Sequence, residues 1–100
     1  MNNLEFTNGA LADLEDIWRY TLETWGNAQA ERYIETLEDA CYSIAANTAR
    51  TRPFPAHDGV SGSCHCEHHY IFYRRDDERT VILAVLHERM DLIARVQDRL

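Results

Sequence analysis

The run Cys64–His69 (CHCEHH) holds the densest set of metal-ligating side chains in the sequence. Side chains alternate between the two faces of a strand, so Cys64, Cys66 and His68 would share one face. Two thiolates and an imidazole could hold zinc if a fourth ligand, such as His57, joined them. Structural zinc sites usually draw on paired knuckles with wider spacing. We therefore expect small residues on a half-exposed strand, and no metal or other cofactor.

A second set of side chains has the groups needed to cleave RNA. Cleavage requires a base that activates the 2′-hydroxyl, cations for the phosphate charge and an acid for the leaving group. Four residues could supply these roles: Tyr73, Arg74, His87 and Arg89. The alternative is structural, with Arg74 and Arg89 paired to Asp76, Asp91 or Glu88. We favour this alternative, because the chain has no lysine and no basic surface to hold RNA. We expect no enzymatic activity and no catalytic residue.

The charge of the chain is negative and unevenly placed. The 100 residues carry a net charge of −7, and all ten cations are arginine. Residues 1–49 hold nine acids against two arginines, whereas residues 50–100 hold eight charges of each sign. Binding to a phosphate backbone needs clustered cations that displace counterions. We therefore expect no direct nucleic-acid binding.

Length and cysteine content indicate a small cytoplasmic protein. One hundred residues suit a single domain, taken here as residues 1–100. The first residues lack the basic and apolar regions of a signal peptide, and no stretch approaches the ~20 apolar residues of a membrane span. Three cysteines without a secretion signal argue against a disulfide framework, so we expect reduced thiols.

The N-terminal half predicts a short strand followed by a helix. Residues 4–7 alternate apolar and polar side chains, and Thr7 or Asn8 can cap the helix that follows. Acids in its first turns suit the helix dipole. Apolar residues then recur three and four apart, which predicts one apolar stripe with Ile17 beside it: Leu11, Leu14, Trp18, Thr21, Leu22 and Trp25.

A second helix follows almost at once. Gly26 suits a left-handed helix end, and Asn27 can cap the next helix. The stripe of this helix consists of Ala30, Tyr33, Ile34, Leu37, Ala40, Cys41, Ile44 and Ala45. Because the connection is so short, the two helices are expected to form an antiparallel hairpin.

The C-terminal half predicts strands and a helical tail. Pro53 and Pro55 mark residues 48–59 as a loop, and residues 61–66 read as a weak edge strand. Residues 69–75 and 80–87 are stronger strands, joined by a turn at residues 76–78. The tail after Asp91 has apolar residues at helical spacing. It either docks on the sheet or presents an apolar stripe to a partner, and both accounts stay open.

These elements predict a two-layer α+β domain. Its order is β-α-α-β-β-β plus the C-terminal helical tail. An antiparallel sheet carries the N-terminal helical hairpin on one face.

This order and several motifs resemble the ParE/RelE toxin superfamily, and ParE in particular. The helical hairpin resembles the family at Phe6-Thr7, Ala12-Asp13-Leu14, Ile17, Tyr20, Trp25-Gly26, Gln29-Ala30 and Tyr33. Residues 47–53 resemble its Asn-Pro-x-x-Gly-Arg-Pro loop, with Thr48 and Thr51 in place of Pro and Gly. Residues 69–74 and 85–91 resemble its two most recognisable strands. The resemblance extends over residues 4–91, with the motifs in register.

The resemblance implies the toxin of a type II toxin–antitoxin system. ParE toxins inhibit DNA gyrase by protein–protein contact and are neutralised by a ParD-like antitoxin, whose C-terminal segment wraps around the toxin. We therefore expect gyrase and a ParD-like antitoxin as partners, a hetero-oligomer with the antitoxin, and no membrane. Two alternatives stay open: a ribosome-dependent mRNA interferase of the RelE type, and a detoxified homologue that only binds antitoxin. The second arises because the family's arginine after Gly59 is missing here.

Two groups of residues are expected to contact these partners. The toxicity surface is predicted to include Arg74, His87, Arg89 and Met90, so Arg74→Ala and Arg89→Ala should reduce growth arrest without unfolding the domain. The antitoxin surface is predicted to include Trp18, Tyr20, Tyr33, Leu37 and Phe72. Most aromatics on such helices are core residues, and Trp18 and Trp25 are expected there unless they line the antitoxin groove. An arginine- or lysine-rich antitoxin segment should contact the acidic residues 1–49.

Overall fold

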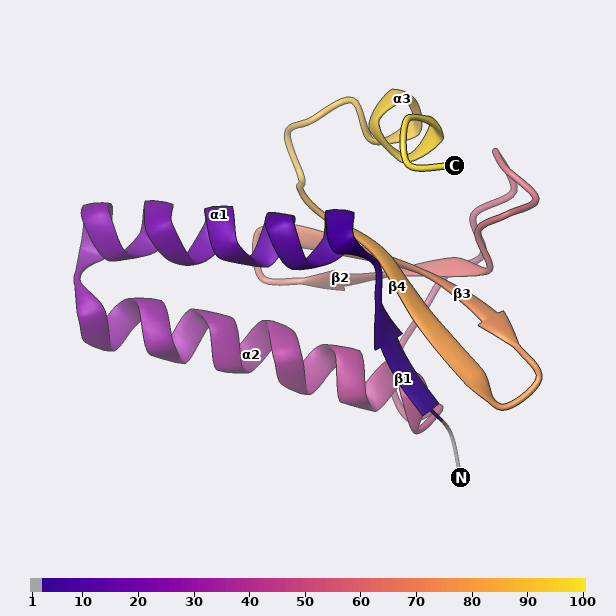
Figure 1. Cartoon of the computed structure of the whole chain (residues 1–100), viewed down its shortest axis with the longest axis horizontal. Coiled ribbons are helices and arrows are strands. Elements are labelled where there is room, and N and C mark those ends of the chain that lie inside the picture. The colour runs from indigo at the N-terminus through magenta and orange to yellow at the C-terminus, as the bar shows by residue number, and fades with distance from the viewer. Residues whose placement is uncertain (1–2) are drawn as a thin grey trace.

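A four-stranded sheet forms the centre of the protein, with a long helical hairpin on one side and a short C-terminal helix on another (Figure 1). The computed structural model describes residues 3–100. Its elements are β1 (Asn3–Phe6), α1 (Asn8–Trp25), α2 (Asn27–Ala45), β2 (Gly62–Cys66), β3 (His69–Asp76), β4 (Arg79–His87) and α3 (Leu92–Gln97). The predicted α+β class and element order are confirmed. No helix within residues 3–100 combines the length and apolar character needed to cross a membrane.

The sheet is mixed, whereas the sequence suggested an antiparallel one. Its strand order is β1-β4-β3-β2, with β2–β3 and β3–β4 antiparallel and β1 parallel to β4. Parallel strands need a long crossover, and here both helices and two strands separate β1 from β4. A two-residue turn joins the strands of each antiparallel pair. One residue of each turn has a positive backbone φ: Glu67 at 55° and Asp77 at 50°.

Thr7, one of the two residues predicted to cap α1, is its N-cap, and Gly26 follows its last residue, Trp25. The Thr7 side chain accepts a hydrogen bond from the Ala10 backbone N–H at 3.0 Å. Gly26 has φ of 90° and donates its N–H to the Leu22 carbonyl at 3.0 Å. The predicted cap at Asn27 is wrong: Asn27 is already the first residue of α2, which begins without a side-chain cap.

The apolar stripe of α2 is confirmed, but that of α1 is rotated from the prediction. In α1 the residues that pack toward the sheet are Ala10, Leu14, Ile17 and Thr21. The predicted stripe residues Leu11 and Trp25 are 51% and 69% exposed.

Both faces of the sheet are covered, one layer more than the predicted two. The hairpin face packs Leu37, Cys41 and Ile44 of α2 against Ile71 and Ile82 of the strands. On the opposite face, residues of β3 and β4 pack against α3 and the loop before β2: Phe54, Val60, Phe72, Leu83, Leu86, Leu92 and Val96. Strands apolar on both faces need this double cover. Because Val96 is fully buried, the tail is docked on the sheet.

Candidate functional site

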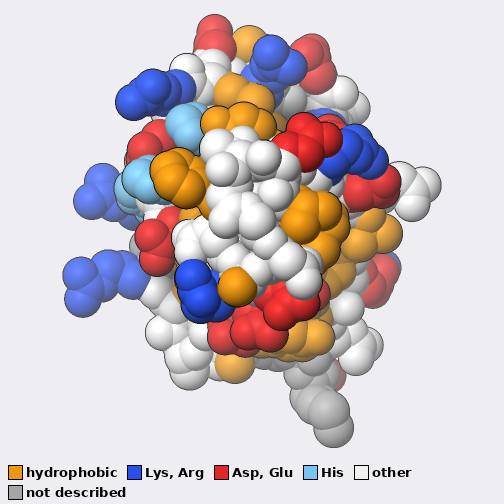
Figure 2. Space-filling model, turned by 90° about the vertical axis from the view of Figure 1, so that its left-hand side faces the viewer, with side chains coloured by type: hydrophobic (Ala, Val, Ile, Leu, Met, Phe, Trp, Pro, Cys, Tyr) orange, Lys and Arg blue, Asp and Glu red, His pale blue; other side chains and the backbone are white. Residues whose placement is uncertain are grey.

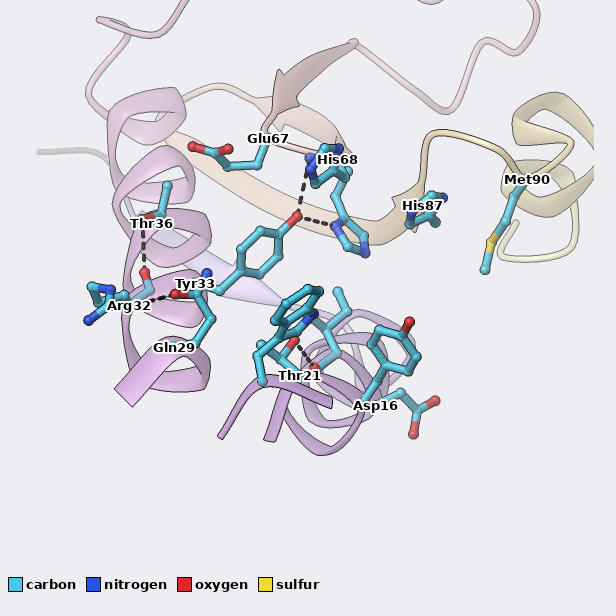
Figure 3. Close-up of a pocket in the computed structure, with 14 residues that line it drawn as sticks. Asp16, Thr21, Gln29, Arg32, Tyr33, Thr36, Glu67, His68, His87 and Met90 are labelled. Carbon is cyan, nitrogen blue, oxygen red and sulfur yellow. Dashed lines mark hydrogen bonds between the residues drawn. The ribbon is translucent and has the colours of Figure 1, made fainter. Parts of the chain in front are cut away.

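A groove of about 940 Å³ opens between the far half of the helical hairpin and one end of the sheet (Figure 3). We call it the hairpin groove. Figure 1 shows the hairpin extending well beyond the strands, so its tip has no sheet beneath it. The lining residues are Asp16, Ile17, Tyr20, Thr21, Trp25, Gln29, Arg32, Tyr33, Thr36, Glu67, His68, His69, His87 and Met90.

The walls of the groove expose large aromatic side chains. Trp25 is 69% and Tyr20 66% exposed, and Met90, which follows β4, is 42% exposed. Figure 2 views the hairpin tip and shows hydrophobic side chains and histidines on this end of the molecule. Exposed apolar surface rimmed by polar groups marks binding surfaces in soluble proteins.

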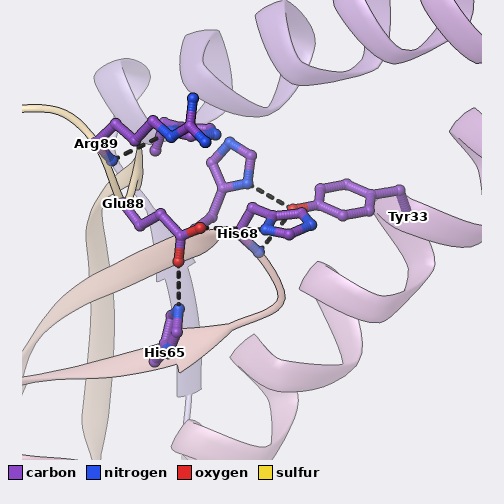
Figure 4. Close-up of polar contacts among 7 residues, drawn as sticks. Tyr33, His65, His68, Glu88 and Arg89 are labelled. Carbon is purple, nitrogen blue, oxygen red and sulfur yellow. Dashed lines mark hydrogen bonds and ion pairs between the residues drawn. The ribbon is translucent and has the colours of Figure 1, made fainter.

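The floor of the groove is a hydrogen-bonded unit built on Tyr33 of α2. Its hydroxyl accepts a hydrogen bond from the His68 backbone N–H at 3.2 Å and lies 2.7 Å from Nδ1 of His69 (Figures 3 and 4). His69 begins β3, is 9% exposed, and meets the ring of His87 edge-on at 5.2 Å. Burial, followed by the nearby His87 and His68, lowers the pKa of His69 to about 4. His69 is therefore neutral at neutral pH.

One rim of the groove is held by Glu88. Its two carboxylate oxygens lie 3.0 Å from Nε2 of His65 and 3.2 Å from Nδ1 of His68 (Figure 4). Hydrogen bonds from His68 and His65 lower the pKa of the Glu88 carboxyl. The His65 ring also stacks on Tyr70 at 4.4 Å. These exposed contacts add little stability, but they connect the β2–β3 turn to the segment after β4.

The Cys64–His69 run does not form one cluster of ligands. Cys64 is buried in the core, and the thiol of Cys66 donates to the Thr36 carbonyl at 3.8 Å. The alternation of side chains between the two sheet faces stops at Cys66, where β2 ends. Glu67 and His68 form the turn, so His68 does not share a strand face with Cys64 and Cys66. No group of three or more His, Cys, Asp or Glu side chains in residues 3–100 is placed to hold a metal ion.

The structure separates the four predicted toxicity residues. His87 and Met90 line the hairpin groove, and Arg89 lies between them in sequence, with no ion pair within residues 3–100. Arg74 lies near the other end of β3, paired across the hairpin with Val81. Positions 69 and 74 are roughly 17 Å apart along an extended strand. Arg74 therefore lies outside the hairpin groove, and its part in a toxicity surface stays a prediction.

Arg74 has the structural role that the sequence also suggested. Its Nε lies 3.0 Å from the Asp76 carboxylate. Arg89, in contrast, forms none of the ion pairs expected for it. Tyr73 is only 8% exposed, and its hydroxyl lies against the backbone of Gly62. Tyr73, Arg74, His87 and Arg89 therefore do not converge on one point.

The predicted antitoxin residues also divide into two groups. Tyr20 and Tyr33 line the hairpin groove, whereas Trp18 is half-buried on α1 and is not among the lining residues. Leu37 and Phe72 are 0% and 1% exposed, so neither offers a side chain to a partner, and their inclusion is corrected. Both belong to apolar patterns that fill the two cores.

Of the groove residues, sequence reasoning named Tyr20, Tyr33, His87 and Met90 as partner contacts and left most of the others out. Trp25 was expected in the core unless it lined the antitoxin groove, and it stands exposed at the hairpin tip. Its position directly before Gly26, where α1 ends, was the available signal. His69 gave no such signal: counting outward from the turn after Asp76 pairs it with Leu86, and only the β-bulge between Phe72 and Tyr73 brings it opposite His87.

Comparison with known proteins identifies the family. The profile described as "ParE toxin of type II toxin-antitoxin system, parDE" matches residues 4–92. The chain belongs to the ParE toxin family. It is 42% identical over 95 residues to "Toxin ParE" of Escherichia coli, covering 94% of this chain and 92% of that protein. It is 32% identical over 91 residues to "Toxin ParE1" of Caulobacter vibrioides, covering 91% and 94%. It is therefore a toxin of the type II toxin–antitoxin class.

Solved structures show the same ParE-like fold. The chromosomal ParDE toxin–antitoxin system from P. aeruginosa matches with a TM-score of 0.74 at 22% identity, covering 87% of this chain and 96% of that one. The YoeB-YefM toxin–antitoxin complex from Staphylococcus aureus matches with a TM-score of 0.58 at 18% identity, covering 87% and 97%. At these identities the likeness concerns the fold.

Proposed function

We propose that this ParE-family chain inhibits DNA gyrase by protein–protein contact and is neutralised by a ParD-like antitoxin that occupies the hairpin groove. One observation carries the proposal. The groove brings residues expected to contact antitoxin, Tyr20 and Tyr33, beside residues expected to carry toxicity, His87 and Met90. An antitoxin segment in the groove would cover both groups at once, and neutralisation would follow by occlusion.

The groove has the size and character of a helix- or peptide-binding site. An amphipathic segment that enters such a groove gains affinity by burying apolar side chains. Trp25 and Tyr20 offer large, exposed aromatic surfaces at its walls. Buried aromatics carry much of the binding energy of protein interfaces. We expect the antitoxin to place apolar side chains against these two residues.

Charge should select the antitoxin segment that covers the helices. The exposed faces of α1 and α2 carry an excess of carboxylates, among them Glu23, Glu31, Glu35 and Glu38. An arginine- or lysine-rich segment would complement them and accelerate association. Salt should then weaken the complex, since exposed charges are screened within about a Debye length. Affinity that does not change with salt would contradict this part of the proposal.

Contact rather than catalysis fits the arrangement of the candidate groups. Arg74 of β3 is paired with Asp76, and it lies near the opposite end of the β3–β4 pair from His87 of β4. Tyr73 is buried. Catalysis of RNA cleavage would require a general base, a phosphate-binding cation and an acid to meet at one substrate. The four candidate side chains, Tyr73, Arg74, His87 and Arg89, do not converge in this way. The proposed toxin therefore acts by occupying its target.

Binding of a ParD-like antitoxin to groove variants tests the proposed site. Trp25→Ala and Tyr20→Ala should each weaken the complex by about 2 kcal/mol, roughly 30-fold, while leaving the fold intact. Tyr42→Ala is the matched control, because Tyr42 is 64% exposed on α2 and does not line the groove. Equal affinities for all three variants would place the antitoxin elsewhere.

Two functional assays distinguish the alternatives. Defined cleavage products from messenger RNA on purified ribosomes would indicate an interferase of the RelE type. Harmless expression with intact antitoxin binding would indicate a detoxified homologue. Growth arrest that the antitoxin relieves, without RNA cleavage, is the expected result.

A further inference from the structure

Two imidazoles on the floor of the hairpin groove are held in the same tautomer. The hydroxyl of Tyr33 accepts the His68 backbone N–H, and within residues 3–100 its own proton has one acceptor in reach, Nδ1 of His69 at 2.7 Å, so we assign the O–H as the donor to that nitrogen. The Arg89 backbone N–H donates to Nδ1 of His87 at 3.1 Å. With Nδ1 occupied by a donor in both rings, each neutral imidazole carries its proton on Nε2.

Both Nε2–H groups are open to the groove. Neither nitrogen has a hydrogen-bond partner among residues 3–100. Every fully buried side-chain nitrogen or oxygen in the same part of the chain has one. The Nε2 atom of His69 is therefore accessible, although the residue as a whole is 91% buried. Both residues line the cavity.

The two donors are close enough to serve one ligand. The ring centroids of His69 and His87 lie 5.2 Å apart with an interplanar angle of 83°. Because Nδ1, the acceptor of each neutral ring, is already engaged, the pair presents only donors to the groove. A carboxylate has two oxygens that accept and none that donates. Each of its oxygens can take one Nε2–H, and the bonds are strengthened by its charge.

The surrounding charges permit a carboxylate at this point. Arg89, two residues after His87, has no ion pair within residues 3–100, so its positive charge is not neutralised there (Figure 4). The carboxylate of Glu88 is engaged by His65 and His68. Asp16 pairs with Arg19 at 3.3 Å. Glu67 is the remaining acid in the lining.

We propose that His69 and His87 form a carboxylate-binding notch, which receives one acidic side chain of the antitoxin segment in the groove. The inference rests on the proposed function for the identity of the occupant. The antitoxin segment would then be basic where it faces α1 and α2, and acidic at one position above the histidine pair. Pairing of a buried acid with fixed donors would set the register of the segment in the groove.

The notch is tested first without any antitoxin. Long-range ¹H–¹⁵N spectra at neutral pH should show the Nε2–H tautomer for both His69 and His87. Sodium acetate should then shift both ring signals saturably, whereas sodium chloride at equal ionic strength should not. His57 is the matched control, because its Nδ1 also accepts a backbone N–H, from Gly59 at 3.0 Å, but it has no second histidine beside it. An Nδ1–H tautomer at either site, or equal shifts with chloride, would overturn the inference.

A pair of variants then tests the notch in the antitoxin complex. His87→Gln keeps an N–H near the position of Nε2, whereas His87→Leu removes it, and both variants lose the Nδ1 acceptor of the Arg89 N–H. Loss of a charged hydrogen bond should weaken binding about tenfold to a hundredfold in the leucine variant only. Changing the antitoxin's acids singly to amides should reveal one whose effect vanishes in His87→Leu.

The two proposals fail in different ways. Equal binding of His87→Gln and His87→Leu, with Trp25→Ala still weakened, would overturn the notch and leave the groove as the antitoxin site. Full binding of Trp25→Ala would reject the groove as the antitoxin site, and the acetate titration would still decide whether the notch exists.

Discussion

Asp13 and Arg99, separated by 86 positions in the sequence, form a two-point ion pair that fastens the C-terminal segment to α1. The two carboxylate oxygens lie 2.6 and 2.9 Å from the guanidinium nitrogens, and one also accepts the Val85 backbone N–H at 2.9 Å. Hydrogen bonding to Asp13 raises the pKa of Arg99. Gly9 allows this approach, since a Cβ there would lie 2.8 Å from the guanidinium.

Replacing Asp13 should therefore loosen both α1 and α3. Asp13→Asn removes the charge that pairs with the half-buried Arg99, and we expect a loss of about 2 kcal/mol in the free energy of unfolding. Urea denaturation measures this change, and hydrogen exchange should show faster opening of residues 92–97. The exposed pair of Arg19 and Glu15 is the control, where Glu15→Gln should change stability by less than about 0.5 kcal/mol.

Removing the hydroxyl of Tyr33 should destabilise the groove floor. In Tyr33→Phe the His68 N–H loses its acceptor and Nδ1 of His69 loses its donor, which should cost about 1–3 kcal/mol. Urea denaturation gives the value. Tyr20→Phe is the matched control, because that hydroxyl has no partner in residues 3–100. A Tyr33→Phe protein as stable as the control would show that the hydrogen-bonded floor contributes nothing.

Acidification should destabilise the fold through His69. Its pKa of about 4 in the folded chain lies below the unfolded value of 6.5, so folding favours the neutral ring. The stabilisation is complete above about pH 6.5 and is lost as the pH falls toward 4, by up to about 3 kcal/mol. The groups facing the ring are Tyr33, His68, His87, Glu88 and Asp13.

Urea midpoints between pH 7.5 and 4.5 measure this dependence. A His69→Asn variant, which cannot titrate, should show a shallower decline over that range. Glu88, whose lowered pKa adds stability only above its own titration, should leave the upper part of the range unaffected. Parallel pH profiles for the two proteins would contradict the assignment to His69.

The structure changes the expectation for the arginines. Arg89 stands beside the groove, so Arg89→Ala should reduce growth arrest. Arg74 is remote and paired with Asp76, so Arg74→Ala should leave arrest nearly unchanged and becomes the control. Growth curves after induction, with expression levels matched, provide the measurement. Loss of toxicity in Arg74→Ala alone would move the active surface to the far end of β3.

Periodicity predicted the elements of this fold well, and its clearest error is the apolar stripe of α1, where one of the misplaced residues, Trp25, lines the groove. The α2 stripe was correct because its apolar residues pack into one core formed with α1 and the strands. The α1 stripe was rotated because Leu11, Leu22 and Trp25 are apolar without being core residues. Binding surfaces break the usual agreement between pattern and burial.

The geometry of the site needed the register of the strands. Sequence alone placed Arg74 and His87 on neighbouring strands but gave no distance along them. The β3–β4 pairing aligns His69 with His87 and Arg74 with Val81, which decides the members of the site. The hydrogen bond from Tyr33 to His69 joins α2 to β3, and no sequence period reports such a contact.

Supercoiling of relaxed DNA by purified gyrase tests the central claim most directly. We predict that the isolated chain inhibits supercoiling, that a ParD-like antitoxin restores it, and that restoration fails at the same antitoxin concentration when Trp25 is alanine. Undiminished supercoiling at a large excess of the chain, with growth arrest still observed in cells, would contradict the account.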